Sequence, residues 1–185
     1  MSNKQNQVNR LQASVVGIGR VHFAFIAILA AQIVVYDAWG LITPQMVLHR
    51  WIAVAGLFVA VTVVWYLAKV LKKRSVALYT SLTFALITAD LLFVSFYVYF
   101  QRGMASRAVV LYLIPIIVSM LLLSRSAIFA TAALAVAAYV TTAVAYFVMN
   151  FNEGYKVELY GEVGFYAALF LIVASLLWVI IRPKR

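Results

Sequence analysis

The sequence predicts an all-α integral membrane bundle of six transmembrane helices with both termini in the cytoplasm. Three observations lead to this prediction: composition, apolar segments of membrane-spanning length, and uneven placement of the basic residues. Of the 185 residues, 66% are hydrophobic and 11% are charged, whereas a soluble domain is about 45–50% apolar and about 25% charged. The mean hydropathy of +1.03 agrees. Cysteine is absent, which excludes disulfides and thiolate metal sites.

A helix needs about 20 mostly apolar residues to cross the hydrocarbon core of a bilayer. We expect spans at Val21–Ile42, Trp51–Leu71, Ser75–Phe100, Ala108–Leu123, Ala127–Met149 and Val163–Ile181. The fourth segment is short, and we expect residues 103–107 to extend it into the headgroup region.

Two terminal segments flank these spans. Residues 1–20 form a polar, basic tail in which Val8, Leu11, Val15 and Ile18 recur at helical spacing. This pattern predicts either a short helix on the inner leaflet or a frayed tail. Residues 182–185 form a basic cytoplasmic end.

The basic residues orient the predicted bundle. Eleven of the 15 Lys and Arg residues fall on the side that holds both termini. The other four are Arg50, Arg102, Arg107 and Lys156. Because short cytoplasmic loops are enriched in Lys and Arg, this side is predicted to be cytoplasmic. The formal charge of +10 then reflects the topology of the chain and does not indicate a nucleic-acid interface. We expect a multi-pass protein of a prokaryotic plasma membrane.

Asp90 is the one carboxylate predicted to lie deep inside a span. It shares a helical face with polar and apolar residues at intervals of three or four, namely Thr80, Thr83, Ile87, Val94 and Tyr97. A charge in the membrane is costly and often functional, so Asp90 is a candidate ligand or proton site. The alternative is a carboxyl that only hydrogen-bonds neighbouring helices. Small polar residues expected near the same depth are Gln32, Thr62, Ser119, Thr141, Thr142 and Ser175.

The outer half of the bundle is the predicted ligand site. Pro115 interrupts the fourth span and, with Tyr97 and Tyr112, could shape an outward-facing pocket. Arg102 and Arg107 would lie at its mouth and receive an anionic group. Pro115 could equally be a packing kink.

Asp37 and Arg50, at the outer edge, are predicted to form a salt bridge that closes the first hairpin. We find no metal constellation, no expected cofactor and no catalytic motif, so the chain is predicted not to be an enzyme.

The segment from Asp90 to Phe100, the turn Gln101-Arg-Gly103 and the stretch Leu111-Tyr-Leu-Ile-Pro115 carry a resemblance. Together with the six-span topology, they resemble the input region of six-helix membrane histidine kinases of the RegB-like or pilus-regulating type. The redox sensors of that family carry a Gly-Gly-x-x-Asn-Pro-Phe-like turn, of which the turn at residues 102–107 keeps one Gly. No phosphoacceptor helix or ATP-binding domain follows in these 185 residues.

The resemblance implies a sensory input domain that binds a small apolar or amphipathic ligand, or senses membrane state, and signals to a cytoplasmic partner. Two other interpretations remain open. One is a six-helix transporter subunit that captures substrate, with the small residues Ala24, Ala27, Ala30 and Ala31 as a docking face. The other is a structural subunit of a larger membrane complex. The expected partners are the lipid bilayer, an amphipathic ligand and a second copy of the chain.

Overall fold

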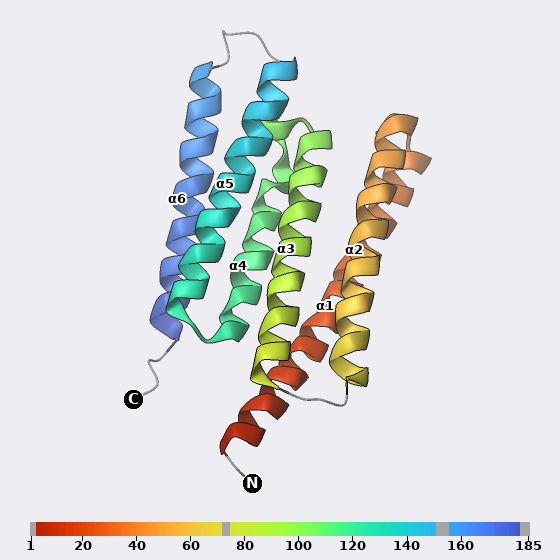
Figure 1. The fold of residues 1–185 in the computed structure, drawn as a ribbon. Coiled ribbons are helices and arrows are strands. Elements are labelled where there is room, and N and C mark those ends of the chain that lie inside the picture. The colour runs from red at the N-terminus through yellow and green to blue at the C-terminus, as the bar shows by residue number, and fades with distance from the viewer. Residues whose placement is uncertain (1–2, 72–74, 151–155, 182–185) are drawn as a thin grey trace. The chain divides into compact units, whose positions relative to one another are not determined.

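The computed structural model describes residues 3–71, 75–150 and 156–181, and this part of the chain is almost entirely helical (Figure 1). The long helices are α1 (Asn3–Ala38), α2 (Pro44–Val70), α3 (Val76–Phe100), α5 (Arg125–Asn150) and α6 (Lys156–Ile180). Between α3 and α5 lie the 3-10 helix η1 (Gly103–Ala105), the 3-10 helix η2 (Arg107–Tyr112), the short α4 (Leu113–Val118) and the 3-10 helix η3 (Ser119–Leu122).

The all-α prediction is confirmed. Five of the described helices are long and apolar enough to cross a membrane, and the segment 107–122 is a shorter apolar helix. Large apolar side chains are exposed along these helices; Val21 and Ile28, for example, are 66% and 67% exposed. Such surfaces are expected where the solvent is lipid. The chain is therefore described as a multi-pass membrane protein.

Helices α1, α2 and α6 begin well before the predicted spans, because hydropathy marks the part of a helix that lies in lipid rather than its ends. Helix α2 begins at Pro44 instead of Trp51. The Thr43 hydroxyl accepts a hydrogen bond from the backbone N–H of Met46 at 3.4 Å, and Pro44 occupies the first turn. Both features favour a helix start. Helix α6 begins at Lys156, well before the predicted Val163.

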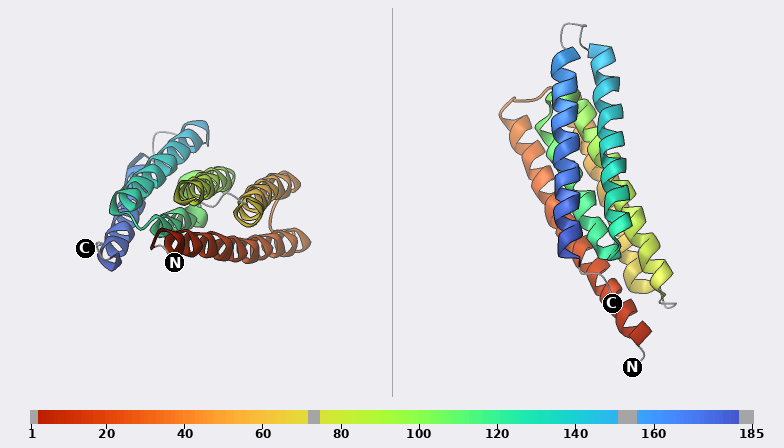
Figure 2. Two further views of the ribbon diagram at one scale, coloured as in Figure 1. Left: turned by 60° about the horizontal axis from the view of Figure 1, so that its bottom comes forward. Right: turned by 90° about the vertical axis from the view of Figure 1, so that its left-hand side faces the viewer.

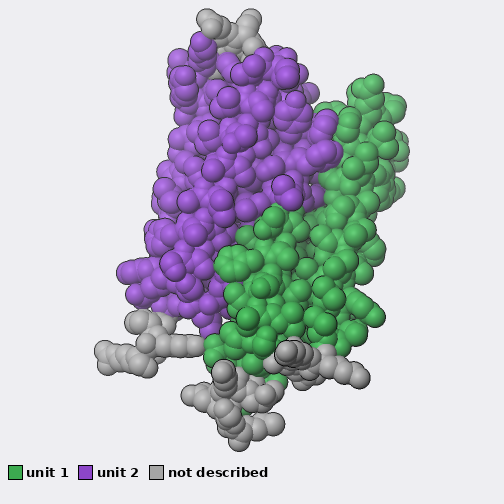
Figure 3. Space-filling model, viewed as in Figure 1, with its two compact units in different colours: residues 1–89 green, residues 90–185 purple. Residues whose placement is uncertain are grey.

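The chain divides into two compact units, residues 1–89 and 90–185, and the boundary falls within α3 (Figure 3). In the first unit α1 and α2 form an antiparallel hairpin whose turn includes Gly40 at a φ of +64°. Gly19 permits a close approach of the two helices, because a Cβ at this position would lie 2.8 Å from Cδ1 of Trp65.

The N-terminal residues continue the first helix without a break. Residues 3–20 belong to α1, and Val8, Leu11 and Val15 are buried in a cluster with residues of α2 and α3. Among the partners in that cluster are Val64 and Tyr79. The helical spacing noted in the sequence is thus the periodicity of a packed face.

The second unit contains the end of α3, the segment 103–122, α5 and α6. Helices α5 and α6 lie side by side (Figures 1 and 2). Ala132 and Ala135 are fully buried on α5, so small side chains allow its neighbours to approach closely. Only a narrow strip of α6 is buried, consisting of Leu159, Phe170 and Ala174.

Candidate functional site

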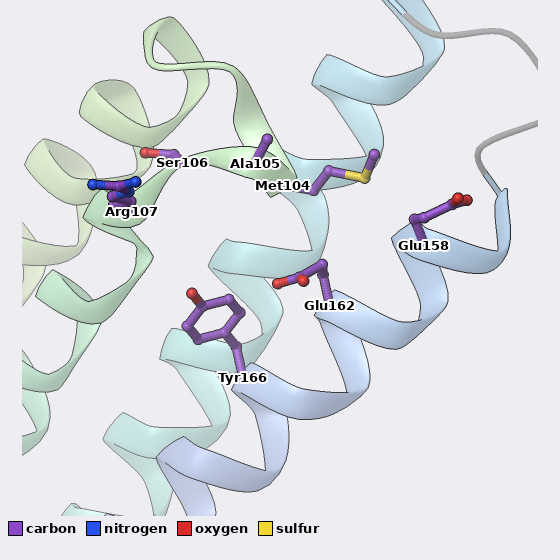
Figure 4. A pocket seen from close by; sticks show the side chains of 7 residues that line it. All are labelled: Met104, Ala105, Ser106, Arg107, Glu158, Glu162 and Tyr166. Atoms are coloured by element: carbon purple, nitrogen blue, oxygen red, sulfur yellow. The ribbon is translucent and has the colours of Figure 1, made fainter.

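A pocket of about 460 Å³ opens in the second unit, at the end of α6 that begins with Lys156 (Figure 4). One wall is the segment from Met104 to Arg107, and the other is the first half of α6. The lining side chains are Met104, Ala105, Ser106, Arg107, Glu158, Glu162 and Tyr166. A volume in the range of about 300–1,000 Å³ is typical of small-molecule sites.

The α6 wall presents a stripe of decreasing polarity. Glu158, Glu162, Tyr166 and Phe170 recur every four residues and therefore follow one side of the helix. The carboxylates are exposed, Tyr166 is partly buried and Phe170 is fully buried. In Figure 4, Glu162 and Tyr166 point from α6 toward the segment 104–107, whereas Glu158 points away from it. An amphipathic molecule matches this order of charge, phenol and apolar ring.

Behind the pocket lies an aromatic cluster of Tyr166, Tyr139, Tyr112 and Phe170, of which only Tyr166 lines the pocket. The ring centroids of Tyr166 and Tyr139 are 5.5 Å apart, and those of Tyr139 and Tyr112 are 6.0 Å apart. Phe170 lies within 6.3 Å of all three other rings. These separations are typical of interacting aromatic pairs. The cluster connects α6, α5 and η2 through rigid side chains.

Hydroxyl groups accompany the aromatic cluster. The Tyr112 hydroxyl lies 2.8 Å from the Ser95 hydroxyl on α3, and Thr142 of α5 is a second hydrogen-bonding neighbour. The Tyr139 hydroxyl is buried and has no hydrogen-bond partner within the described residues. It lies close enough to Glu162 and Tyr166 for electrostatic interaction with both. The hydrogen bond between Tyr112 and Ser95 therefore joins the aromatic cluster to α3.

The loop wall depends on two residues with left-handed backbone conformations. Arg102 has a φ of 79° and Gly103 a φ of +58°. A Cβ on Gly103 would lie 2.5 Å from the Cβ of Tyr146, so only glycine permits η1 to approach α5 this closely. The Ser106 hydroxyl then accepts a hydrogen bond from the N–H of Ala108 at 3.1 Å and caps η2.

Of the predicted site residues, only Arg107 lines this pocket, and Tyr112 belongs to the aromatic cluster. Arg102 is exposed outside the lining, and Pro115 is buried within α4. The pocket carries two carboxylates beside Arg107, where the sequence suggested a purely basic mouth.

Asp90 and Tyr97 lie elsewhere, on the predicted face of α3. Asp90 is 2% exposed and Tyr97 is 3% exposed; Thr83, Ile87 and Val94 on the same face are also buried. Thr80, at the start of this face, is only partly buried. The face thus points into the protein as expected, but neither Asp90 nor Tyr97 lines the pocket.

Three of the small polar residues expected near one depth form hydrogen bonds within their own helices. Thr141, Thr142 and Ser175 each donate a hydrogen bond of 2.8 Å to the carbonyl four residues earlier in their own helix. A hydroxyl in an apolar environment is satisfied most simply in this way. At the other predicted pair, the guanidinium of Arg50 lies 5.5 Å from the ring centroid of Tyr36, and Asp37 is exposed.

Sequence reasoning missed Glu158, Glu162, Tyr139 and Tyr166. The signal was present in the spacing of four between Glu158, Glu162 and Tyr166, but the sixth span was predicted to begin only at Val163. Among the described residues, no group of three His, Asp or Glu side chains could hold a metal ion. Comparisons with protein-family models, curated proteins and solved structures give no match for this chain.

Proposed function

We propose that the chain is a sensory input domain of the plasma membrane that binds a small amphipathic ligand and relays its presence to a cytoplasmic partner. The observation that carries this proposal is the pocket itself, whose α6 wall presents two carboxylates and the phenol of Tyr166, and whose Tyr166 packs against the buried aromatic cluster. A ligand that moves Tyr166 acts directly on Tyr139 and, through Tyr112, on Ser95 of α3. The resemblance to histidine-kinase input regions supports the same role.

In this proposal the chain crosses the membrane six times and both termini lie in the cytoplasm, so the pocket faces the outer side of the membrane. The segment 107–122 is short for a span, but two of its three parts are 3-10 helices. At about 2.0 Å per residue in 3-10 helix and about 1.5 Å in α-helix, it is about 29 Å long, close to a hydrocarbon core of about 30 Å. The excess of Lys and Arg on the side of the termini supports the orientation.

A contact between α5 and α6 at their cytoplasmic ends would pass the signal to the partner. The guanidinium of Arg125, at the start of α5, lies 4.1 Å from the ring centroid of Trp178 on α6. It also donates a hydrogen bond of 3.2 Å to the carbonyl of Ile181. Tyr166 and Trp178 lie about 18 Å apart along the axis of α6. A small shift of α6 caused by a ligand at Tyr166 would therefore also move Trp178. Rigid-body helix shifts of this kind are a common switching mode.

Native mass spectrometry of the purified chain tests ligand binding. We expect the wild type to retain a small molecule that Tyr166→Ala loses. Tyr160→Ala is the matched control, because Tyr160 lies on the same helix but is 70% exposed and outside the pocket. Asp90→Asn tests whether the site extends to Asp90. If no form retains a molecule, the proposed ligand site is wrong.

Tryptophan fluorescence tests the relay. Trp178 is the only Trp of the second unit, so replacing the other three, Trp39, Trp51 and Trp65, by Phe leaves a single reporter. We expect its emission maximum to differ between the ligand-loaded and ligand-free protein. Binding with no change at Trp178 would contradict a sensor and favour the transporter-subunit alternative.

A further inference from the structure

The pocket carries opposite charges on its two walls. Glu158 and Glu162 project from α6, and Arg107 belongs to the loop wall. No ion pair joins Arg107 to either carboxylate in the part of the chain that the structure describes. Like charges one helical turn apart, as in Glu158 and Glu162, repel each other and are relieved by a bound cation. The charges are therefore available to a ligand on both walls.

A cationic group finds two favourable partners on the α6 wall. Glu162 provides a carboxylate, and the ring of Tyr166 follows one turn further along the same side of the helix. Ammonium groups bind well between a carboxylate and an aromatic face, because both present negative potential. The buried ring of Tyr139 lies 5.5 Å from that of Tyr166, behind the lining, and supports its position.

Neither a simple anion nor a simple cation matches the whole lining. An anion meets Arg107 but is repelled by two carboxylates, whereas a cation meets the carboxylates but is repelled by Arg107. A zwitterion satisfies both walls. The volume of about 460 Å³ admits a headgroup-sized molecule.

We propose, resting on the ligand-binding function above, that this pocket binds a zwitterion whose ammonium group contacts Glu162 and Tyr166 and whose anionic group contacts Arg107. The shared chemistry is that of a soluble zwitterion or of a zwitterionic lipid headgroup. Glu158 adds negative potential at the entrance, and Met104 and Ala105 contact the apolar parts.

Calorimetry on the full chain in an uncharged maltoside detergent tests the chemical class. Three probes separate the charges: glycerophosphocholine carries both, choline only the cation, and glycerol phosphate only the anion. We expect glycerophosphocholine to bind at least about tenfold more tightly than either of the other probes. Equal or tighter binding of glycerol phosphate would overturn the proposal.

Paired variants assign each charge to its wall. Glu162→Gln should weaken the binding of glycerophosphocholine and of choline about tenfold and leave the binding of glycerol phosphate unchanged. Arg107→Gln should weaken the binding of glycerophosphocholine and of glycerol phosphate without weakening that of choline. Asp37→Asn and Arg20→Gln are the matched controls, because both residues are exposed and outside the lining. Losses of the same size in the controls would overturn the proposal.

Native mass spectrometry with equal amounts of phosphatidylcholine and phosphatidylglycerol identifies the source of the zwitterion. Retention of phosphatidylcholine that is lost in Glu162→Gln indicates a lipid headgroup. Binding of glycerophosphocholine without lipid retention indicates a soluble zwitterion. If the protein retains another molecule that depends on Tyr166 but not on Glu162, the zwitterion proposal fails while the proposed sensor function stands.

Discussion

Replacing Gly103 by alanine should destabilise the protein through one identifiable collision. Gly103 begins η1 with a φ of +58°, and an added Cβ would lie 2.5 Å from Cβ and 2.6 Å from Cγ of Tyr146 on α5. Ordinary van der Waals contact begins near 3.4 Å. The atoms in the way are the root of the Tyr146 side chain, which cannot turn aside without a movement of the α5 backbone.

The expected loss in the free energy of unfolding has two contributions, one from the backbone and one from the collision. An L-residue other than glycine in the left-handed region costs about 1–2 kcal/mol. Extra atoms in a packed contact cost about 1–3 kcal/mol. We therefore expect Gly103→Ala to lower the free energy of unfolding by about 2–5 kcal/mol. The displaced loop wall should also weaken ligand binding in the pocket, because Met104 to Arg107 follow directly.

Equilibrium unfolding in mixed micelles measures the loss, and Gly40→Ala is the matched control. Gly40 has a φ of +64°, but a Cβ there would meet nothing within 4 Å. Gly40→Ala should therefore lower the free energy of unfolding only by the backbone contribution of about 1–2 kcal/mol. A double-mutant cycle with Tyr146→Gly, which removes the Cβ as well as the ring, should recover the steric part as a coupling energy of about 1–3 kcal/mol. Equal losses in Gly103→Ala and Gly40→Ala, with no coupling to Tyr146, would refute the reasoning.

Three further predictions concern the interior of the second unit. Ser95→Ala should lower the free energy of unfolding by about 1 kcal/mol, because Tyr112 loses the hydroxyl that lies 2.8 Å from its own. In a double-mutant cycle, Tyr112→Phe should remove the effect of Ser95→Ala. Tyr139→Phe should leave stability unchanged or raise it by about 1 kcal/mol, because the hydroxyl is buried without a partner among the described residues; a clear loss in thermal unfolding would contradict this. Arg125→Gln should lower stability by about 1–2 kcal/mol and shift the emission of Trp178, whereas an unchanged spectrum would argue against the 4.1 Å ring contact.

The candidate site was only partly predictable. Arg107 was predicted to lie at the mouth of an outward-facing pocket, and Tyr112 was predicted to help shape that pocket. Glu158 and Glu162 precede the predicted sixth span, which was placed at Val163–Ile181 because charged residues lower the local hydropathy. They nevertheless continue a helix, since Glu and Lys are good helix formers and the first turn favours acids.

The environment of Arg50 also depends on the tertiary structure. Asp37 and Arg50 were predicted to form a salt bridge because both lie at the outer edge of the bundle, and this pairing stays a prediction. In the structure Arg50 belongs to the buried face of α2, and its guanidinium lies 5.5 Å from the ring centroid of Tyr36. Helix α2 begins after the N-cap Thr43, which the apolar pattern did not mark.

The sequence by itself determined that the chain is helical and built for a membrane, because lipid requires long apolar segments with internally satisfied backbone groups. It also determined that one face of α3, including Asp90, is buried, since a period near 3.6 places those residues together. Only the tertiary structure decided that the segment 104–107 and the start of α6 enclose one pocket. Their juxtaposition depends on the close approach of Gly103 to Tyr146 and on the ring contacts among Tyr112, Tyr139 and Tyr166. Contacts between residues so distant in the chain are set by side-chain shape at the interface, which local periodicity does not encode.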